Sequence, residues 1–247
     1  MNNIIKSDEN ILDKAIKHME SYLQVKNNIL ENDYVQLIGD SSRVVGFLHN
    51  SSKLIHKKKF QSFLKGFSMN EEPTQAQLVK LIEYVDDETK AEFVADVFSK
   101  ILFSNSSKSC VVMGSILNDI VKSNTELSHE QLNSIHALVH FYDIDIDNYR
   151  FLYSNVKNTF ENKIAHNQLQ IKIREIDINI TSLFMTLEKA IANQLFYRSI
   201  SVDLDVDVSS EYTADANAHT DELYLLTRSG HLLGKYIERI YDRLNLG

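Results

Sequence analysis

The acidic segment DIDIDN, residues 143–148, opens with the D-x-D-x-[DN] spacing of a calcium-binding loop. Such a loop needs a glycine at its sixth position and a bidentate glutamate at its twelfth, where Asn148 and Ser154 stand in this chain. We therefore expect Asp145 or Asp147 to cap or turn a helix. The sequence predicts no calcium site here.

Two histidines, His136 and His140, form an H-x3-H pair whose imidazoles fall on one side of a helix, where a zinc ion can bridge them. His129 lies on the same side but about 16 Å from His140 along the helix axis. Asp143 is the one further ligand close in sequence, whereas a protein zinc site has at least three protein ligands. We therefore predict no metal site and no cofactor.

Arg43 and His49 stand six residues apart in RVVGFLH. The pair resembles the R-x(4–6)-H motif of HEPN-type RNases, in which both side chains act on the scissile phosphate within a helical bundle. Those enzymes usually follow the arginine with a polar residue, whereas Val44 stands here. The chain has no glycine-rich phosphate loop and no G-x-S-x-G elbow. A HEPN-like RNase is therefore the enzymatic alternative to a non-enzymatic role.

The most basic stretch is KLIHKKKFQSFLK, in which Lys57, Lys58 and Lys59 precede Phe60 and Phe63. These lysines could contact the phosphates of nucleic acid or an anionic membrane surface. The more common arrangement is a helix whose aromatic residues enter the core while its lysines stay in water. We favour that second interpretation.

The segment ISVDLDVDV, residues 200–208, alternates between apolar residues and Asp203, Asp205 and Asp207. This alternation predicts a strand with one apolar and one acidic face. Successive acidic residues on such a face are about 7 Å apart, too far for all three to bind one metal ion. We expect a solvated acidic face that, with Glu211 in the following loop, binds a basic protein partner.

Composition indicates a soluble, mainly α protein. One proline and seven glycines in 247 residues leave few helix breakers, and a hydrophobic content of 43% suffices for a core. The net charge of −8 argues against nucleic-acid binding driven by overall charge. The single cysteine, Cys110, excludes an internal disulfide, and its apolar context predicts a buried thiol. Without a signal-peptide or membrane-spanning pattern, we expect a cytoplasmic location.

We expect two parts, an N-terminal helical bundle over 1–157 and a long helix plus a C-terminal module over 158–247. We interpret 158–197 as the long helix, because its apolar residues are spaced alternately by four and three, as in a coiled coil. The same segment also alternates in a way that suits strands. A helix would use this seam as the spine of the fold or as a homodimer contact. The seam comprises Leu169, Ile173, Ile176, Ile180, Leu183 and Leu187.

The C-terminal part resembles the end of a winged helix. TSLFMTLEKAIANQLFYRSISV corresponds to the recognition helix and the strand that leaves it, and SSEYTADANAHTD to the wing loop. A return strand and a last helix follow, and Leu226, Thr227 and Gly230 match the Leu-Thr-x-x-Gly that often opens this helix. The resemblance implies a mainly α fold, a helical bundle with a C-terminal winged-helix-like module that contains one small antiparallel β-hairpin.

A winged-helix DNA-binding regulator is the runner-up for function. The recognition helix would offer Lys189, Asn193 and Arg198 to the duplex, and the basic stretch would offer Lys57 to Lys59 to phosphates. From Ser199 to Glu222 inclusive, the chain has seven acidic residues and no lysine or arginine. An acidic wing repels phosphates, so we expect this module to act as a scaffold or to contact protein rather than to read DNA.

The whole layout resembles bacterial helical proteins of the Abi-alpha abortive-infection type. These carry a segment like KKKFQSFLKGF, a helical bundle and a similar LT..G ending. Members of that type often have a hydrophobic membrane segment, which this chain lacks. The resemblance implies a role in antiphage defence or phage counter-defence. Together these observations favour a non-enzymatic protein-interaction or regulatory module with a protein partner.

Overall fold

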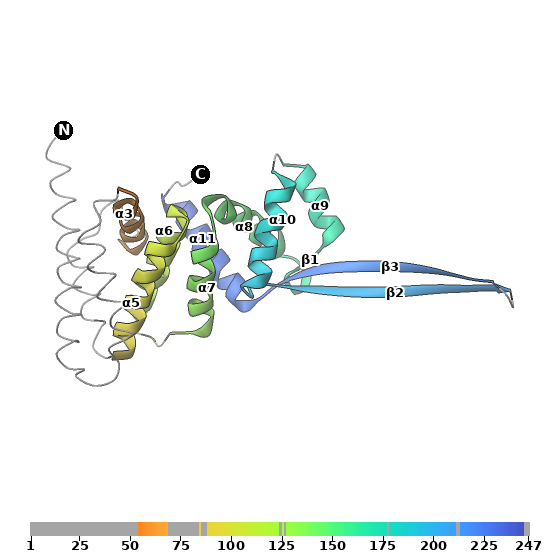
Figure 1. The fold of residues 1–247 in the computed structure, drawn as a ribbon, viewed down its shortest axis with the longest axis horizontal. Helices are drawn as coiled ribbons and strands as arrows, with labels where there is room; N and C mark the ends of the chain where they lie inside the picture. Colours follow the sequence, from red (N-terminus) through yellow and green to blue (C-terminus); the bar gives the residue numbers. More distant parts are fainter. Residues whose placement is uncertain are drawn as a thin grey trace. The chain divides into compact units, whose positions relative to one another are not determined.

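The computed structural model describes residues 54–68, 84, 88–123, 125, 127–176, 178–210 and 213–244. Within them the chain forms eight α-helices and three β-strands, so the prediction of a mainly α protein is confirmed (Figure 1). None of the described helices is both long and apolar enough to cross a membrane. Arg43, His49 and Glu211 lie outside the described residues.

The chain divides into two compact units. The first draws on 1–128, 138–143 and 238–247, and the second on 129–137 and 144–237. The division follows contacts in space rather than chain order. It differs from the boundary at residue 157 that the sequence suggested, because helices α7 and α11 each contribute residues to both units.

The described core of the first unit includes α3 (Leu54–Ser68), α5 (Glu88–Phe103) and α6 (Ser107–Ser123). Aromatic rings join α3 to α5, since the ring of Phe98 lies 5.4 Å from that of Phe63 in an edge-on contact. Helix α6 is buried along most of its length. A helix that is covered on nearly every side occupies the centre of its unit.

Helix α3 has one apolar and one basic side. Phe60 and Phe67 are buried, whereas Lys58 is exposed and Lys59 is half-buried. The interpretation of the basic stretch as the solvated side of a core helix is therefore confirmed for these residues. The side chain of Lys57 lies outside the described set.

Two glycines bring α3 and α6 into close contact. A Cβ atom at Gly66 would lie 1.8 Å from the carbonyl oxygen of Val111. A Cβ atom at Gly114 would lie 2.1 Å from the carbonyl oxygen of Phe63. Both distances are far below van der Waals contact, so neither position accepts a side chain unless the helices move apart.

We predict that Gly114→Ala lowers the free energy of unfolding by about 2 to 3 kcal/mol, because the added methyl group separates α3 from α6. Urea unfolding followed by circular dichroism measures this loss. The matched control is Lys122→Ala on the exposed side of α6, which should change stability by no more than about 0.5 kcal/mol. Equal stability of the two variants would contradict the close helix contact.

The thiol of Cys110 is buried in α6, as its sequence context predicts. Burial raises its pKa to about 11. Because the folded state holds this proton more tightly than the unfolded state, the thiol's contribution to the free energy of unfolding declines as pH rises from about 9 towards 11. The native protein should resist a thiol reagent at about pH 8 and react fully in denaturant. Rapid labelling of the native protein would contradict this burial.

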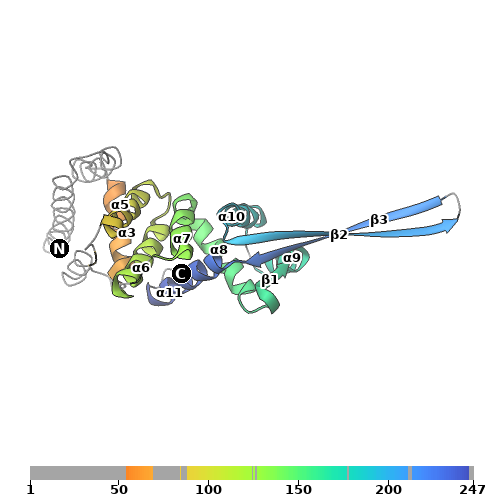
Figure 2. The ribbon, with the colours of Figure 1, turned by 90° about the horizontal axis from the view of Figure 1, so that it is seen from below.

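The second unit combines helices with a three-stranded antiparallel sheet (Figures 1 and 2). The sheet contains β1 (Lys163–Ala165), β3 (Thr213–Leu226) and β2 (Phe196–Ser210), in that spatial order. The helices are α8 (Asp143–Val156), α9 (His166–Arg174) and α10 (Ile180–Ala192), with most of α7 (His129–His140) and α11 (Arg228–Leu244). The chain order from β1 is therefore strand, helix, helix, strand, strand, helix.

The hairpin of β2 and β3 is much longer than the small hairpin that the sequence suggested. Its strands have 15 and 14 residues, and β3 runs through most of the segment 209–221 that we expected to be a loop. The register continues in unbroken pairs from Phe196↔Leu226 to Val208↔Ala214. Alanine, asparagine and aspartate have low strand propensity, but pairing with the strongly alternating β2 overrides it.

The segment 158–197 forms two helices, not one long helix. Helix α9 ends at Arg174, and α10 begins only after Asn179, whose Oδ1 accepts a hydrogen bond from the backbone N–H of Ser182 at 2.9 Å. An N-cap of this kind starts a new helix because it satisfies a backbone donor that has no partner within the helix. The regular spacing of apolar residues thus continues from one helix into the next. It does not indicate that the helix is interrupted between them.

Candidate functional site on helix α10 and the hairpin

The Leu-Thr-x-x-Gly segment forms a junction at the base of the hairpin. The Thr227 hydroxyl oxygen accepts a hydrogen bond from the N–H of Gly230 at 3.0 Å, which caps α11. The same hydroxyl lies within donating distance of two carbonyl oxygens, 2.8 Å from that of Gln194 and 3.0 Å from that of Leu195. The backbone N–H of Thr227 also donates to Leu195 at 3.1 Å. One residue thereby joins the end of α10 to the start of α11.

Gly230 lets the backbone approach this junction closely. A Cβ atom there would lie 2.0 Å from the carbonyl oxygen of Leu195. The carbonyl oxygen of Gly230 accepts a hydrogen bond from the buried hydroxyl of Tyr149 on α8 at 2.9 Å. The Tyr149 ring also contacts Phe196 edge-on at 5.8 Å. The motif that carries the winged-helix resemblance thus has a structural role in this chain.

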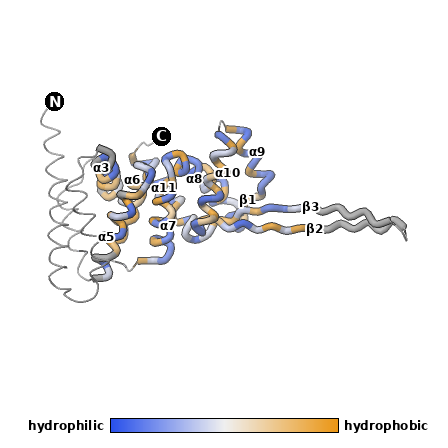
Figure 3. The backbone as a smooth tube through the Cα atoms, viewed as in Figure 1, coloured by the Kyte–Doolittle hydropathy of each residue, from blue (hydrophilic) through white to orange (hydrophobic). Residues whose placement is uncertain are grey.

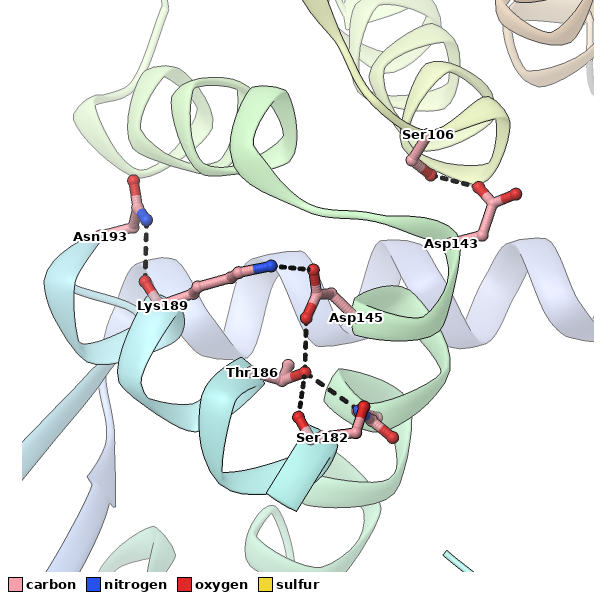
Figure 4. Close-up of polar contacts among 8 residues, drawn as sticks. Ser106, Asp143, Asp145, Ser182, Thr186, Lys189 and Asn193 are labelled. Atoms are coloured by element: carbon pink, nitrogen blue, oxygen red, sulfur yellow. Dashed lines mark hydrogen bonds and ion pairs between the residues drawn. The ribbon is translucent and has the colours of Figure 1, made fainter. Parts of the chain in front are cut away.

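A buried polar cluster joins α8 to α10 (Figure 4). Asp145, only 4% exposed, pairs with the Nζ of Lys189 at 2.5 Å and accepts a hydrogen bond from the Thr186 hydroxyl at 2.6 Å. The side-chain amide of Asn148 donates to Thr186 and to the Ser182 hydroxyl, each at 3.0 Å. A buried carboxylate is stable only when it is paired and hydrogen-bonded, and here α10 supplies both contacts.

The residues that a DNA-reading helix would have used make contacts within the second unit. Lys189 is paired with Asp145. The side-chain amide of Asn193 donates to the carbonyl oxygen of Lys189 at 2.8 Å, which closes the end of α10. Arg198 forms ion pairs with Glu188 and, at 3.0 Å, with Glu222. A duplex would therefore have to compete with existing partners for each of the three.

A second polar cluster connects α9 with the sheet. Nδ1 of His166 lies 2.9 Å from the hydroxyl of Tyr224 and 3.5 Å from a carboxylate oxygen of Glu222. Burial raises the pKa of Tyr224 far above its ordinary value, and the neighbouring Glu222 carboxylate raises it further, so the phenol keeps its proton. The side chains of His166, Tyr224 and Glu222 thus interact with one another and hold β3 against α9.

The exposed side of α10 is apolar and acidic rather than basic. Thr181, Met185 and Glu188 are exposed along it, and Met185 is 59% exposed. A shallow groove on this side, also lined by Ile180, Phe184 and the Asp145-paired Lys189, has a volume of about 560 Å³. A helix with this surface is suited to apolar contact with a protein and has little to offer a phosphate backbone.

Strand β2, which follows α10 in the chain, exposes two large apolar side chains to water. Ile200 is 58% exposed and Val202 is 57% exposed. Figure 3 shows the described part of β2 with hydrophobic positions opposite a largely hydrophilic stretch of β3. The groove on α10 and these exposed β-branched residues at the base of β2 are the candidate surfaces of the second unit for binding another molecule.

The acidic residues expected to bind a partner lie on this hairpin. Asp203 pairs with His219, Asp205 with Asn217 and Asp207 with Asp215 along the ladder. Their side chains are outside the described set. A partner that binds this acidic strand remains a prediction.

The calcium-like segment is not a loop. Asp143 is the first residue of α8, and its carboxylate accepts hydrogen bonds from the Ser106 hydroxyl at 2.5 Å and the Lys108 N–H at 3.0 Å (Figure 4). His136 and His140 are both exposed on α7. Over the described ranges, no group of three or more histidine, cysteine, aspartate or glutamate residues could hold a metal ion.

The apolar seam is divided between the interior and the surface. Leu169, Ile173, Leu183 and Leu187 are buried within this chain, whereas Ile176 and Ile180 are exposed. The four buried residues pack inside the unit, because α9 and α10 fold back instead of forming one helix. A homodimer along this seam could therefore use only the two exposed isoleucines.

Comparison with known proteins finds no matching protein family, and no curated protein or solved structure matches the chain.

Sequence reasoning missed the buried role of Asp145 and the contact from Tyr149 to Gly230. Both connect segments far apart in the chain, by 44 residues for Asp145 with Lys189 and by 81 for Tyr149 with Gly230. A weak signal was present, because Asp145 lies four residues before Tyr149 and so on the same side of a helix as that large aromatic residue. The spacing of residues along the chain does not identify Lys189 as the partner of Asp145.

We predict that Lys189→Met lowers the free energy of unfolding by about 2 to 4 kcal/mol, because it leaves the Asp145 carboxylate buried without its cation. The double variant with Asp145→Asn should recover part of that loss, which a double-mutant cycle in urea measures. Lys235→Met on the exposed side of α11 is the control and should change stability little. Additive effects of the two substitutions would contradict the pair.

Proposed function

We propose that this chain is a non-enzymatic protein-interaction module whose second unit is winged-helix-like. The order strand, helix, helix, strand, strand, helix, with Thr227 capping the last helix, supports the likeness. In this proposal α10 stands in the recognition position and the long hairpin is the wing. The resemblance to the Abi-alpha type suggests antiphage defence or phage counter-defence as the setting.

The observation that carries the proposal is the surface of α10 together with the base of β2. Met185, Ile200 and Val202 are each more than half exposed. The cations that would face a duplex, Lys189 and Arg198, are paired with carboxylates of the same unit. An apolar surface with its nearby cations already paired suits a protein partner better than nucleic acid.

The experiment compares capture of partners by the tagged chain and by surface variants, with bound proteins identified by mass spectrometry. Met185→Asp and Ile200→Asp should each lose a stoichiometric partner, because a charge in an apolar contact is desolvated without compensation. Ile144→Asp is the matched control, since Ile144 on α8 is similarly exposed, at 53%, and lies outside this surface. Equal capture by all three variants would contradict the proposal.

Specific binding to nucleic acid is the result that would reverse this proposal. We expect the chain to show no specific binding to labelled duplex DNA in fluorescence anisotropy at moderate salt. Binding that weakens steeply as salt rises, and that Arg198→Gln weakens further, would make the module a DNA reader. Folding of each variant is checked by circular dichroism, so that loss of binding is not loss of structure.

A further inference from the structure

The outer edge of β2 has no strand partner within the part of the chain that the structure describes. In the sheet order β1, β3, β2, strand β2 lies at one side and pairs with β3 only. The hairpin continues beyond α9 and α10 of the same unit (Figure 1), and Ile200, Ser201 and Val202 are three consecutive exposed residues. A strand edge of this kind presents a row of backbone N–H and C=O groups to which another strand can pair.

Strand β2 is long and regular for an edge strand. Natural sheets protect their edges with proline, lysine, bulges or short strands. From Ser199 to Val208, β2 contains no proline and no lysine, and its register with β3 shifts only between Val208 and Ser210. Its alternate positions carry apolar residues, mostly of the β-branched types that favour strands, namely Ile200, Val202, Leu204, Val206 and Val208. The aspartates between them are therefore what decides which strand can pair with this edge.

We propose that the outer edge of β2 binds an extended basic segment of a protein partner, which joins the sheet as a further strand. Asp203, Asp205 and Asp207 occupy every second position of β2 and so belong to one face of the strand. An added strand places its own residues opposite these positions, where opposite charges stabilise a cross-strand pair. In this binding mode backbone hydrogen bonds give affinity and alternate side chains give selectivity. The inference goes beyond the proposed function, because it does not depend on the surface of α10.

Charge selects a basic segment over a second copy of this chain. When two copies pair edge to edge about a two-fold axis perpendicular to the sheet, their equivalent faces lie on the same side. The aspartates of both strands would then share one face as like charges, which destabilise cross-strand pairs. A segment with lysine or arginine at every second position avoids this repulsion and forms opposite-charge pairs instead.

The opposite edge of the hairpin suits an added strand less well. Strand β1 pairs with β3 only from Leu223 to Leu225, so beyond this point the described part of β3 also has an open edge. On the face without the β2 aspartates, however, β3 contributes mainly small or polar residues, namely Ala214, Ala216, Ala218, Thr220 and Glu222. Cross-strand pairs with β-branched residues contribute more than pairs with alanine. Strand β2 is therefore the edge that gains more from a neighbour.

Binding of synthetic peptides to the full chain, measured by fluorescence anisotropy, tests the proposal. The probe is a labelled, end-capped peptide as long as the segment 200–208, in which lysine and valine alternate. It should bind at least about tenfold more tightly than the same peptide with glutamate in place of lysine, because each cross-strand attraction becomes a repulsion. N-methylation of alternate residues removes the backbone donors on one edge of the peptide and keeps its charge. In one of the two phases of methylation, binding should weaken by at least about tenfold.

Two charge reversals identify the edge. Asp207→Lys and Asp215→Lys are matched variants, because the two positions are directly paired on β2 and β3. The lysine peptide should bind several-fold more weakly to the first variant than to the second, because Asp207 belongs to the edge strand and Asp215 lies one strand further away. Circular dichroism checks that both variants fold. A greater loss from Asp215→Lys would assign the peptide to β3 and would overturn the inference.

Two other results would also overturn it. The first is no binding of the lysine peptide to the parent chain. The second is equal binding of the lysine peptide and both of its N-methylated forms, because attraction by charge alone needs no backbone hydrogen bonds. If Met185→Asp nevertheless loses its captured partner, the proposed function stands and this inference alone fails. Peptide binding by a chain that captures no partner through α10 would give the reverse outcome.

Discussion

The hydroxyl of Thr227 is the contact on which the second unit depends. It caps α11 through Gly230 and reaches the carbonyl oxygens of Gln194 and Leu195, which lie between α10 and β2. Both strands of the hairpin start or end next to this residue, since β2 begins at Phe196 and β3 ends at Leu226. This junction fixes the base of the hairpin together with the pairing of β1 and β3. Two further contacts complete the junction. Gly230 has no Cβ atom, so α11 can approach the carbonyl oxygen of Leu195, and the hydroxyl of Tyr149 connects α8 to the carbonyl oxygen of Gly230.

The polar groups around this junction are used for folding. Lys189 neutralises Asp145 between α8 and α10, and Arg198 is held between Glu188 and Glu222. Charges committed in this way stabilise the position of α10 and are not easily released, because each release would leave a carboxylate without its partner. Among the residues whose side chains are described, those that α10 and the base of the hairpin expose to water are therefore largely apolar or acidic. This is the physical basis for proposing a protein partner.

The first unit is organised by a different constraint, the close contact of α3 and α6 at Gly66 and Gly114. Periodic aromatic residues on α3 predict a buried side, and that side is buried at Phe60 and Phe63. The sequence does not reveal which helix the glycines meet, because the partner residue Val111 is 45 positions from Gly66 and belongs to another helix. Local spacing identifies a face of a helix, whereas only packing identifies its neighbour.

The amino-acid sequence by itself determined the mainly α class, the buried thiol of Cys110 and the alternation that makes β2 a strand. These follow from local periodicity and composition, which act between residues close in the chain. Tertiary structure decided the length of β3, the separation of α9 from α10 and the pairing of Lys189 with Asp145. Each of these results depends on a partner far away in the chain. A polar stretch such as 213–221 becomes a strand because β2 lies beside it, and a seam becomes two short helices because their apolar sides pack within the same unit.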